Sequence, residues 1–163
     1  MFWKRRPKSA NPASPSFSIA AGQRVYAIGD IHGRDDLFAL LLERIAEDNA
    51  ARGPARVTLI LLGDLVDRGP DSAAVVERAR QQAGLWDAFH WITGNHEEAF
   101  LLALSGDLEA LRFFCRYGGE ETILSYGLPK LSLRAMDYPE LAAVLPTLVP
   151  PEHVAFLQSG EAW

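Results

Sequence analysis

VTLILLGDLVDRG, residues 57–69, joins six residues that are apolar or β-branched to a polar turn bounded by two glycines. A short run of this kind, with no polar alternation, is typical of a strand that is buried on both faces of a parallel sheet. The turn that follows holds two carboxylates and an arginine, and its glycines suit a sharp change of chain direction. The stretch therefore predicts a buried strand that delivers charged side chains to one edge of a sheet.

The same pattern of strand and turn occurs once before and once after this stretch. VYAI at 25–28 leads into GDIHG, and FHWIT at 89–93 leads into GNHEE. The two intervening segments have helical periodicity and are long enough for a crossover between parallel strands. The sequence therefore predicts an α/β fold whose sheet is built from βαβ units and flanked by helices.

Each of the two crossover helices has an apolar face that we expect to pack against the sheet. This face consists of Leu37, Leu40, Leu41 and Ile45 in the first helix, and of Ala74, Val75 and the aliphatic stem of Arg78 in the second. A third, shorter helix is expected at about 97–105, where Glu97 and Glu98 would favour a helix N-terminus electrostatically.

Composition indicates one globular domain preceded by an arm. The chain has 163 residues, 48% of them hydrophobic, and a net charge of −5, which argues against a surface devoted to nucleic acid. Residues 1–23 are basic and rich in proline and serine, so we expect a flexible arm followed by one domain over 24–163. The single cysteine, Cys115, fits a cytoplasmic protein. No segment approaches the apolar length of a membrane span, so no stable membrane insertion is expected.

The polar turns carry residue types that bind metals. Asp30 and His32 follow the first strand, Asp64 follows the second and Asn95 follows the third. Because the carboxyl ends of parallel strands lie at one edge of a sheet, these four side chains are expected to converge. Carboxylate, imidazole and amide groups together suit a divalent cation such as Mn²⁺, Fe²⁺ or Zn²⁺. Taken singly, each residue also has an ordinary structural explanation, such as a helix cap or a turn.

The motifs GDIHG, GDLVDRG and GNHE resemble those of the calcineurin-like metallophosphoesterases, specifically the phosphoprotein phosphatase branch with its bacterial and phage serine/threonine phosphatases. The resemblance covers about residues 24 to 127, including RYGGEETILSYG. It implies a site with two divalent ions, manganese being favoured over iron or zinc. By motif position it implies that Asp64 bridges both ions. The implied metal ligands are Asp30, His32, Asp64 and Asn95.

The resemblance also implies roles in substrate binding and catalysis. Arg68, Asn95 and His96 would bind the substrate phosphate, and His96, oriented by Asp67, would act as general acid. These roles suit the residue types. A planar guanidinium such as that of Arg68 can pair two phosphate oxygens, and a carboxylate such as Asp67 can hold an imidazole in its protonated form.

The C-terminal part of the chain departs from the family pattern. Members of the family complete the second metal site with two further histidines and add a second phosphate-binding arginine, in motifs that do not occur here. His90 and His153 have neighbours that suggest structural roles. The second metal site is therefore expected to be half built. We expect an N-terminal portion of a longer phosphatase that lacks the second sheet of the family fold, and exposed strand surface that favours self-association.

Three functions stay open at this point. The main expectation is a metal-dependent serine/threonine protein phosphatase that uses direct attack of metal-activated water, with weak activity in this chain alone. The alternatives are hydrolysis of dinucleoside polyphosphates and a non-catalytic fragment that binds metal or phosphate. The resemblance favours the phosphatase, since tetraphosphatase relatives commonly lack the carboxylate at Asp67 and carry aspartate in place of Glu97. The expected partner is a phosphorylated protein or a small phosphoester, and no nucleic acid.

Overall fold

A parallel sheet of three strands organises the chain. The structure, a computed structural model, describes residues 18–161, so most of the predicted arm over 1–23 lies outside the described residues. The strands are β1 (Gln23–Ile28), β2 (Arg56–Leu61) and β3 (Ala88–Trp91), and β2 is the central strand. Both pairings are parallel. The predicted α/β fold, with its βαβ connections and flanking helices, is therefore confirmed.

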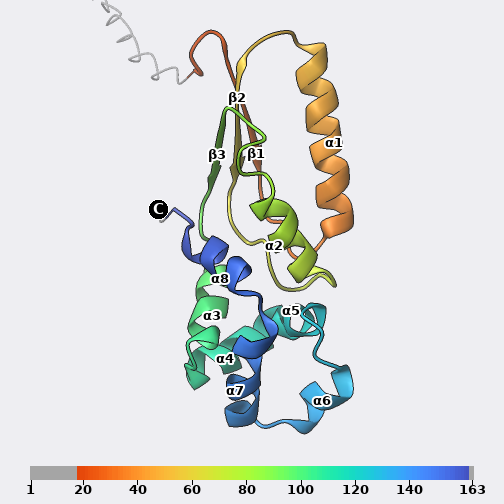
Figure 1. The fold of residues 1–163 in the computed structure, drawn as a ribbon, viewed down its shortest axis with the longest axis vertical. Coiled ribbons are helices and arrows are strands. Elements are labelled where there is room, and N and C mark those ends of the chain that lie inside the picture. Colours follow the sequence, from red (N-terminus) through yellow and green to blue (C-terminus); the bar gives the residue numbers. More distant parts are fainter. Residues whose placement is uncertain (1–17, 162–163) are drawn as a thin grey trace, which may run out of the picture.

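The helices lie beside the sheet and beyond the carboxyl ends of its strands. Figure 1 shows α1 alongside the sheet, α2 at its lower end, and most of the remaining helices gathered below. Among residues 18–161, no helix has the length and apolarity needed to cross a membrane. The helical elements are α1 (Asp35–Ala51), α2 (Ser72–Arg80), α3 (Asn95–Leu104), α4 (Leu108–Phe114), the π-helical turn η1 (Cys115–Gly119), α5 (Glu120–Ser125), α6 (Lys130–Ala135), α7 (Tyr138–Leu148) and α8 (Pro151–Gln158).

The core is centred on β2 and continues into the helical layer. Leu59 and Leu61 of β2 are fully buried, and they belong to the same apolar cluster as Phe38 of α1 and Val75 of α2. Phe100 of α3 belongs to this cluster as well. Burial of the central strand explains why its sequence lacks polar alternation.

The predicted inward face of α1 is wrong for three of its four residues. Leu37, Leu40 and Leu41 are 51%, 48% and 42% exposed, whereas Phe38 and Ile45 are buried. Residues seven apart return to the same side of a helix, so Phe38 and Ile45 form the stripe that faces the core. The three leucines lie on the remaining sides of α1. Within residues 18–161, β1 is an edge strand, and no further strand pairs with its outer side.

The inward face of α2 was predicted in part. Val75 is buried as expected, together with Val76 and Ala79, but Ala74 is exposed. The guanidinium of Arg78 forms two hydrogen bonds to the carboxylate of Asp35, at 2.6 and 2.8 Å. Arg78 therefore ties α2 to the start of α1 instead of lying flat on the sheet.

A buried carboxylate joins the turns that follow β2 and β3. Glu97 is fully buried and accepts hydrogen bonds from the backbone N–H groups of Asp64, Leu65 and Val66, at 2.9, 2.8 and 3.1 Å. It also accepts one from the N–H of Gly94, at 3.0 Å. Burial raises the pKa of Glu97, and these four hydrogen bonds oppose that rise. The expectation that Glu97 serves only a helix N-terminus was therefore too narrow.

Gly94 makes this close approach of the two turns possible. A Cβ atom at this position would collide with the carboxylate of Asp64 and lie 2.9 Å from a carboxylate oxygen of Glu97. Any side chain here would push the turn after β2 away from the first turn of α3.

We expect Leu59→Ala to lower the free energy of unfolding by about 2–5 kcal/mol, because it leaves a cavity beside fully packed neighbours. Leu40→Ala, at a half-exposed position on α1, should change it by less than about 0.5 kcal/mol. Urea denaturation followed by circular dichroism would measure both. Equal losses in the two variants would contradict the placement of the core.

Glu97→Ala is expected to cost at least about 3 kcal/mol of stability, because it leaves several buried N–H groups without an acceptor. The matched control is Glu98→Ala, which removes an exposed carboxylate from the next position and should change stability by less than about 0.5 kcal/mol. The same denaturation measurement applies. A loss for Glu97→Ala as small as that of the control would show that water satisfies these N–H groups.

Candidate metal centre

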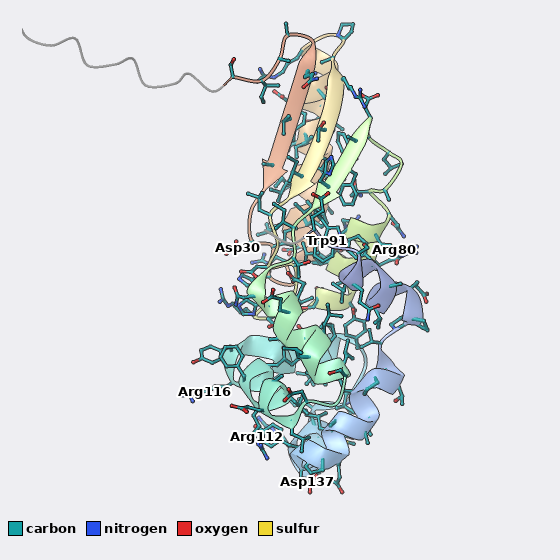
Figure 2. All side chains as sticks on the ribbon, turned by 90° about the vertical axis from the view of Figure 1, so that its left-hand side faces the viewer. Asp30, Arg80, Trp91, Arg112, Arg116 and Asp137 are labelled. Atoms are coloured by element: carbon teal, nitrogen blue, oxygen red, sulfur yellow. The ribbon has the colours of Figure 1, made fainter. Side chains whose placement is uncertain are left out.

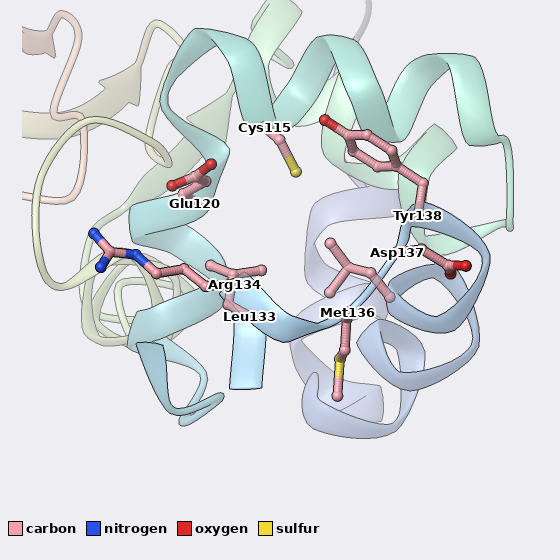
Figure 3. Close-up of a pocket in the computed structure, with 8 residues that line it drawn as sticks. Cys115, Glu120, Leu133, Arg134, Met136, Asp137 and Tyr138 are labelled. Carbon is pink, nitrogen blue, oxygen red and sulfur yellow. The ribbon is translucent and has the colours of Figure 1, made fainter. Parts of the chain in front are cut away.

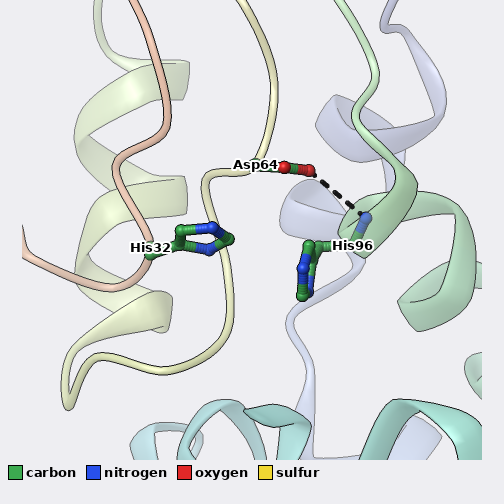
Figure 4. A group of neighbouring side chains, drawn as sticks. All are labelled: His32, Asp64 and His96. Atoms are coloured by element: carbon green, nitrogen blue, oxygen red, sulfur yellow. Dashed lines mark hydrogen bonds between the residues drawn. The ribbon is translucent and has the colours of Figure 1, made fainter. Parts of the chain in front are cut away.

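Side chains from all three polar turns meet at the carboxyl ends of the strands. His32 follows β1, Asp64 follows β2, and His96 lies in the first turn of α3. One ligand-type atom from each lies within 4.8 Å of the other two, and Figure 4 shows the three side chains around a common space. The Asp64 carboxylate also accepts a long hydrogen bond, at 3.4 Å, from the backbone N–H of His96. The turns that the sequence predicted to converge do so around these three residues.

The imidazole of His32 is held in one tautomer by the backbone. Its Nδ1 lies 2.8 Å from the carbonyl oxygen of Val66. A carbonyl oxygen can only accept, so Nδ1 carries the hydrogen and donates it. The lone pair of Nε2 is therefore available toward the cluster, in the arrangement that a metal-ligating histidine usually has.

His96 is oriented by a buried carboxylate. Its Nδ1 lies 2.6 Å from Oδ2 of Asp67, and both side chains are almost fully buried. The other oxygen of Asp67 accepts a hydrogen bond from the hydroxyl of Thr122, at 2.7 Å. Burial raises the pKa of Asp67, while the hydrogen bonds from His96 and Thr122 lower it. Asp67 therefore fixes the ring so that Nε2 of His96 faces the cluster.

Arg68 spans the space between the two imidazoles. One terminal nitrogen of its guanidinium lies 2.7 Å from Nε2 of His32, and the other lies 3.0 Å from Nε2 of His96. A guanidinium can only donate, so each Nε2 acts as an acceptor in this arrangement. The backbone N–H of Arg68 donates to the carbonyl oxygen of Gly118, at 3.0 Å, which anchors the exposed side chain at its base.

Four non-glycine residues in this region have left-handed backbones. The φ angles are 45° at His32, 52° at Asp64, 73° at Asp67 and 67° at Arg68. Within residues 18–161 these are the non-glycine residues with positive φ. Such conformations cost about 1–3 kcal/mol each and cluster at functional sites, where the surrounding structure enforces them. The residues with left-handed backbones are therefore ones whose side chains form or orient the candidate site.

Two of the predicted metal ligands lie at the margin of this cluster. Asp30 has a carboxylate oxygen 3.8 Å from Nε2 of His32, and its side chain is 65% exposed. Figure 2 shows Asp30 near the junction between the sheet and the helices. Asn95 is the exposed first residue of α3, directly before His96. Their predicted role as ligands stays a prediction.

Three residues that support the site were not predicted. Thr122 and Ser72 both accept hydrogen bonds from the backbone N–H of Asp67, at 2.9 and 3.0 Å, and Gly118 accepts from Arg68. Thr122 lies 55 residues from Asp67 in the chain, so no local pattern pointed to this contact. RYGG, which contains Gly118, was noted for its resemblance but had no predicted contact.

The two remaining histidines have partners elsewhere. His153 is buried, and its ring nitrogens lie 3.1 Å from the hydroxyl of Tyr126 and 3.2 Å from the carboxylate of Glu77. His90 lies 2.7 Å from the carboxylate of Glu161. Both arrangements agree with the structural roles expected for these residues.

The donor set of the cluster suits a divalent transition metal. The imidazole nitrogen of His32, with its oriented lone pair, and the carboxylate of Asp64 form a mixed nitrogen and oxygen set, which fits Mn²⁺, Fe²⁺ or Zn²⁺, and His96 lies beside them. The hydrogen bonds at both Nδ1 atoms supply the outer contacts that fix metal-binding imidazoles in other proteins. The residues present therefore fit a metal of this class.

Known proteins resemble this chain in sequence and, in part, in structure. The symmetrical bis(5'-nucleosyl)-tetraphosphatase of Acidovorax sp. (strain JS42) is 44% identical over 82 residues, which is 50% of this chain and 26% of that protein. A protein of the same name from Pseudomonas fluorescens (strain SBW25) is 39% identical over 87 residues, 53% of this chain and 28% of that protein. The chain thus matches little more than a quarter of the length of these relatives.

A crystal structure provisionally described as a diadenosine tetraphosphatase has a TM-score of 0.48 at 24% identity, covering 86% of this chain and 44% of that chain. The sequence model of one family, described as calcineurin-like phosphoesterase, matches residues 23–143. Since this match extends over most of the chain and includes all three polar turns, the protein belongs to the calcineurin-like phosphoesterase family.

Proposed function

We propose that this chain carries metal-binding and phosphate-binding residues of a metal-dependent hydrolase that cleaves dinucleoside polyphosphates. The observation that carries the proposal is the convergence of His32, Asp64 and His96 at the ends of three strands in a calcineurin-like phosphoesterase. The substrate class is supported by the tetraphosphatase relatives. Symmetrical cleavage of a dinucleoside tetraphosphate by water would release two nucleoside diphosphates.

The proposed metal ligands are Asp30, His32, Asp64 and Asn95. Their turns lie at one edge of the sheet. His32 and Asp64 belong to the cluster that they form with His96. When bound, divalent ions would supply the Lewis acidity that phosphoryl transfer to water requires. In this chain Asp64 is the central ligand of the proposal, because its turn is fixed by Glu97 and its carboxylate lies between the two histidine-bearing turns.

Arg68 would bind the phosphoryl group of the substrate. Its two terminal nitrogens already point at one space, between His32 and His96, and two oxygens of one phosphate can occupy the same donors. The anchor between its backbone and Gly118 would hold the guanidinium near the reacting group. Positive charge at this point also compensates for charge that develops on the phosphoryl oxygens.

His96 would supply a proton to the leaving oxygen. Its Nδ1–H is committed to Asp67, so the proton that it transfers must be carried on Nε2, which accepts from Arg68 in this structure and would be released when Arg68 binds the phosphate. The hydrogen bond to the Asp67 carboxylate fixes the ring so that Nε2 points toward the leaving oxygen. A nucleoside diphosphate leaving group is more easily expelled when its oxygen is protonated as the bond to phosphorus breaks.

A serine/threonine protein phosphatase is the second candidate. It is favoured by the carboxylate of Asp67, which holds His96 here and which the resemblance associates with that branch. The curated relatives support the tetraphosphatase instead, and the sequence-based preference for the phosphatase branch has no support from them. The substrate experiment below separates the two.

Asp64→Asn should weaken Mn²⁺ binding by at least about tenfold more than Asn95→Ala does, because it removes a negative charge whereas Asn95→Ala removes one neutral oxygen. Isothermal titration calorimetry with MnCl₂ measures both affinities. Glu47→Gln, an exposed carboxylate on α1, is the control and should leave binding unchanged. Equal losses for Asp64→Asn and Asn95→Ala would contradict the central role of Asp64.

With Mn²⁺ present, we expect kcat/KM on diadenosine tetraphosphate to exceed that on a phosphoserine peptide by at least about tenfold. Chromatography should show ADP as the sole nucleotide product. In the control variant His96→Asn, kcat should fall about 10²–10⁴-fold, since proton donation acts in the transition state. A preference for the phosphopeptide would overturn the proposal in favour of the protein phosphatase. An undiminished kcat in His96→Asn would show that the measured activity does not come from this site.

A further inference from the structure

A groove between α3 and α4 begins at the candidate metal centre. Asn95, the neighbour of His96 at the start of α3, and Phe113, near the end of α4, both line it, and its volume is about 370 Å³. Leu102, which is 52% exposed, contributes apolar surface to its wall. Glu98 and Glu109 place two carboxylates along it. A hollow of this size falls within the range of small-molecule sites.

Phe113, which lines this groove, lies against a second exposed aromatic side chain, Tyr117. Phe113 and Tyr117 are each 49% exposed, and their ring centroids are 4.4 Å apart at an interplanar angle of 38°. The guanidinium of Arg116 lies 5.9 Å from the centre of the Tyr117 ring. Contiguous exposed apolar surface of this kind often marks ligand sites.

A break in the helical backbone presents this pair beside Arg68. Tyr117 and Gly118 lie in η1 and have non-helical backbones, with φ values of −105° and 111°. A Cβ atom at Gly118 would come 2.9 Å from Cγ of Arg68, and the Gly118 carbonyl accepts from the backbone N–H of Arg68. The aromatic pair is therefore next to two residues proposed to bind phosphate, Arg68 and Asn95.

The charges around the groove restrict what can occupy it. Glu98 and Glu109 disfavour a second anionic group, so the phosphates of a substrate belong at Arg68 and not in the groove. A neutral planar group can stack on Phe113 and Tyr117, and its amino groups can donate to carboxylates. A nucleobase joined to phosphates through a ribose has this combination of properties.

We propose that Phe113 and Tyr117 form a nucleobase subsite, which stacks one base of a dinucleoside polyphosphate while Arg68 and the metal ligands hold its phosphates. The proposal rests on the proposed function for the identity of the substrate. Stacking of one base on aromatic side chains typically strengthens binding by about 5- to 150-fold.

Binding of ADP and of pyrophosphate in the presence of Mn²⁺ tests this subsite without requiring turnover. Phe113→Ala and Tyr117→Ala should each weaken ADP binding by about 5- to 150-fold and leave pyrophosphate binding within about twofold of wild type. Tyr117→Phe keeps the ring and should retain the affinity for ADP. Isothermal titration calorimetry measures all of these affinities.

Tyr138→Ala is the matched control for loss of an exposed aromatic ring. Tyr138 is 38% exposed and lines a separate hollow with Cys115, Leu133 and Met136 (Figure 3). Its neighbour Asp137 lies at the end of the molecule away from Asp30 (Figure 2). This variant should leave ADP binding unchanged.

Unchanged ADP binding in both alanine variants would overturn the subsite, and so would an equal loss for ADP and pyrophosphate. Weaker binding of a phosphoserine peptide, with ADP unaffected, would assign the aromatic pair to a protein ligand and overturn it as well. Failure to hydrolyse diadenosine tetraphosphate would instead contradict the proposed function. In that case the calorimetric comparison of ADP with pyrophosphate would still test whether the aromatic pair binds a base.

Discussion

Four backbone N–H groups from two different turns converge on the carboxylate of Glu97, and the candidate site depends on this contact. β2 ends at Leu61, and the left-handed backbones at Gly63 and Asp64 form the turn after it, so the N–H groups of residues 64–66 have no partner in the sheet. Glu97 satisfies them from the first turn of α3. The same carboxylate holds Gly94, directly before Asn95 and His96. Asp64 and His96 are therefore placed relative to each other by one buried side chain that reaches neither the metal cluster nor solvent.

The two imidazoles follow a common rule in different surroundings. His32 is oriented by a backbone carbonyl, and His96 by the carboxylate of Asp67, which is itself held by Thr122. In both rings the hydrogen bond at Nδ1 directs Nε2 toward the cluster. A neutral partner suits a histidine that only donates a lone pair to a metal, whereas an anionic partner suits one that must carry a proton. The difference between the partners thus agrees with the different roles proposed for the two histidines.

The sequence predicted the strands and the turns because their signals are local. An apolar run followed by a glycine and an aspartate reveals both the strand and its end, as at β2 and Asp64. The buried side of α1 was not predictable in the same way, because the helix has apolar residues on several sides and the sheet selects only the stripe of Phe38 and Ile45. Contacts such as Thr122 with Asp67, or Gly118 with Arg68, join residues about 50 positions apart, so no periodic pattern in the sequence indicates them. Glu97 was noticed for its charge, but its role depends on which N–H groups the left-handed turn leaves unpaired.

The distribution of the candidate ligands along the chain links metal binding to folding. His32, Asp64 and Asn95 come from three separate turns, each more than 30 residues from the next, and these turns approach one another only when all three strands are aligned. An unfolded chain therefore offers no preformed chelate, and a metal that occupies this cluster binds the native state preferentially. The left-handed residues in these turns raise the energy of the native state, and the free energy of metal binding would offset part of that strain. If these residues hold a metal as proposed, the stability of the fold would depend on the free metal concentration around it.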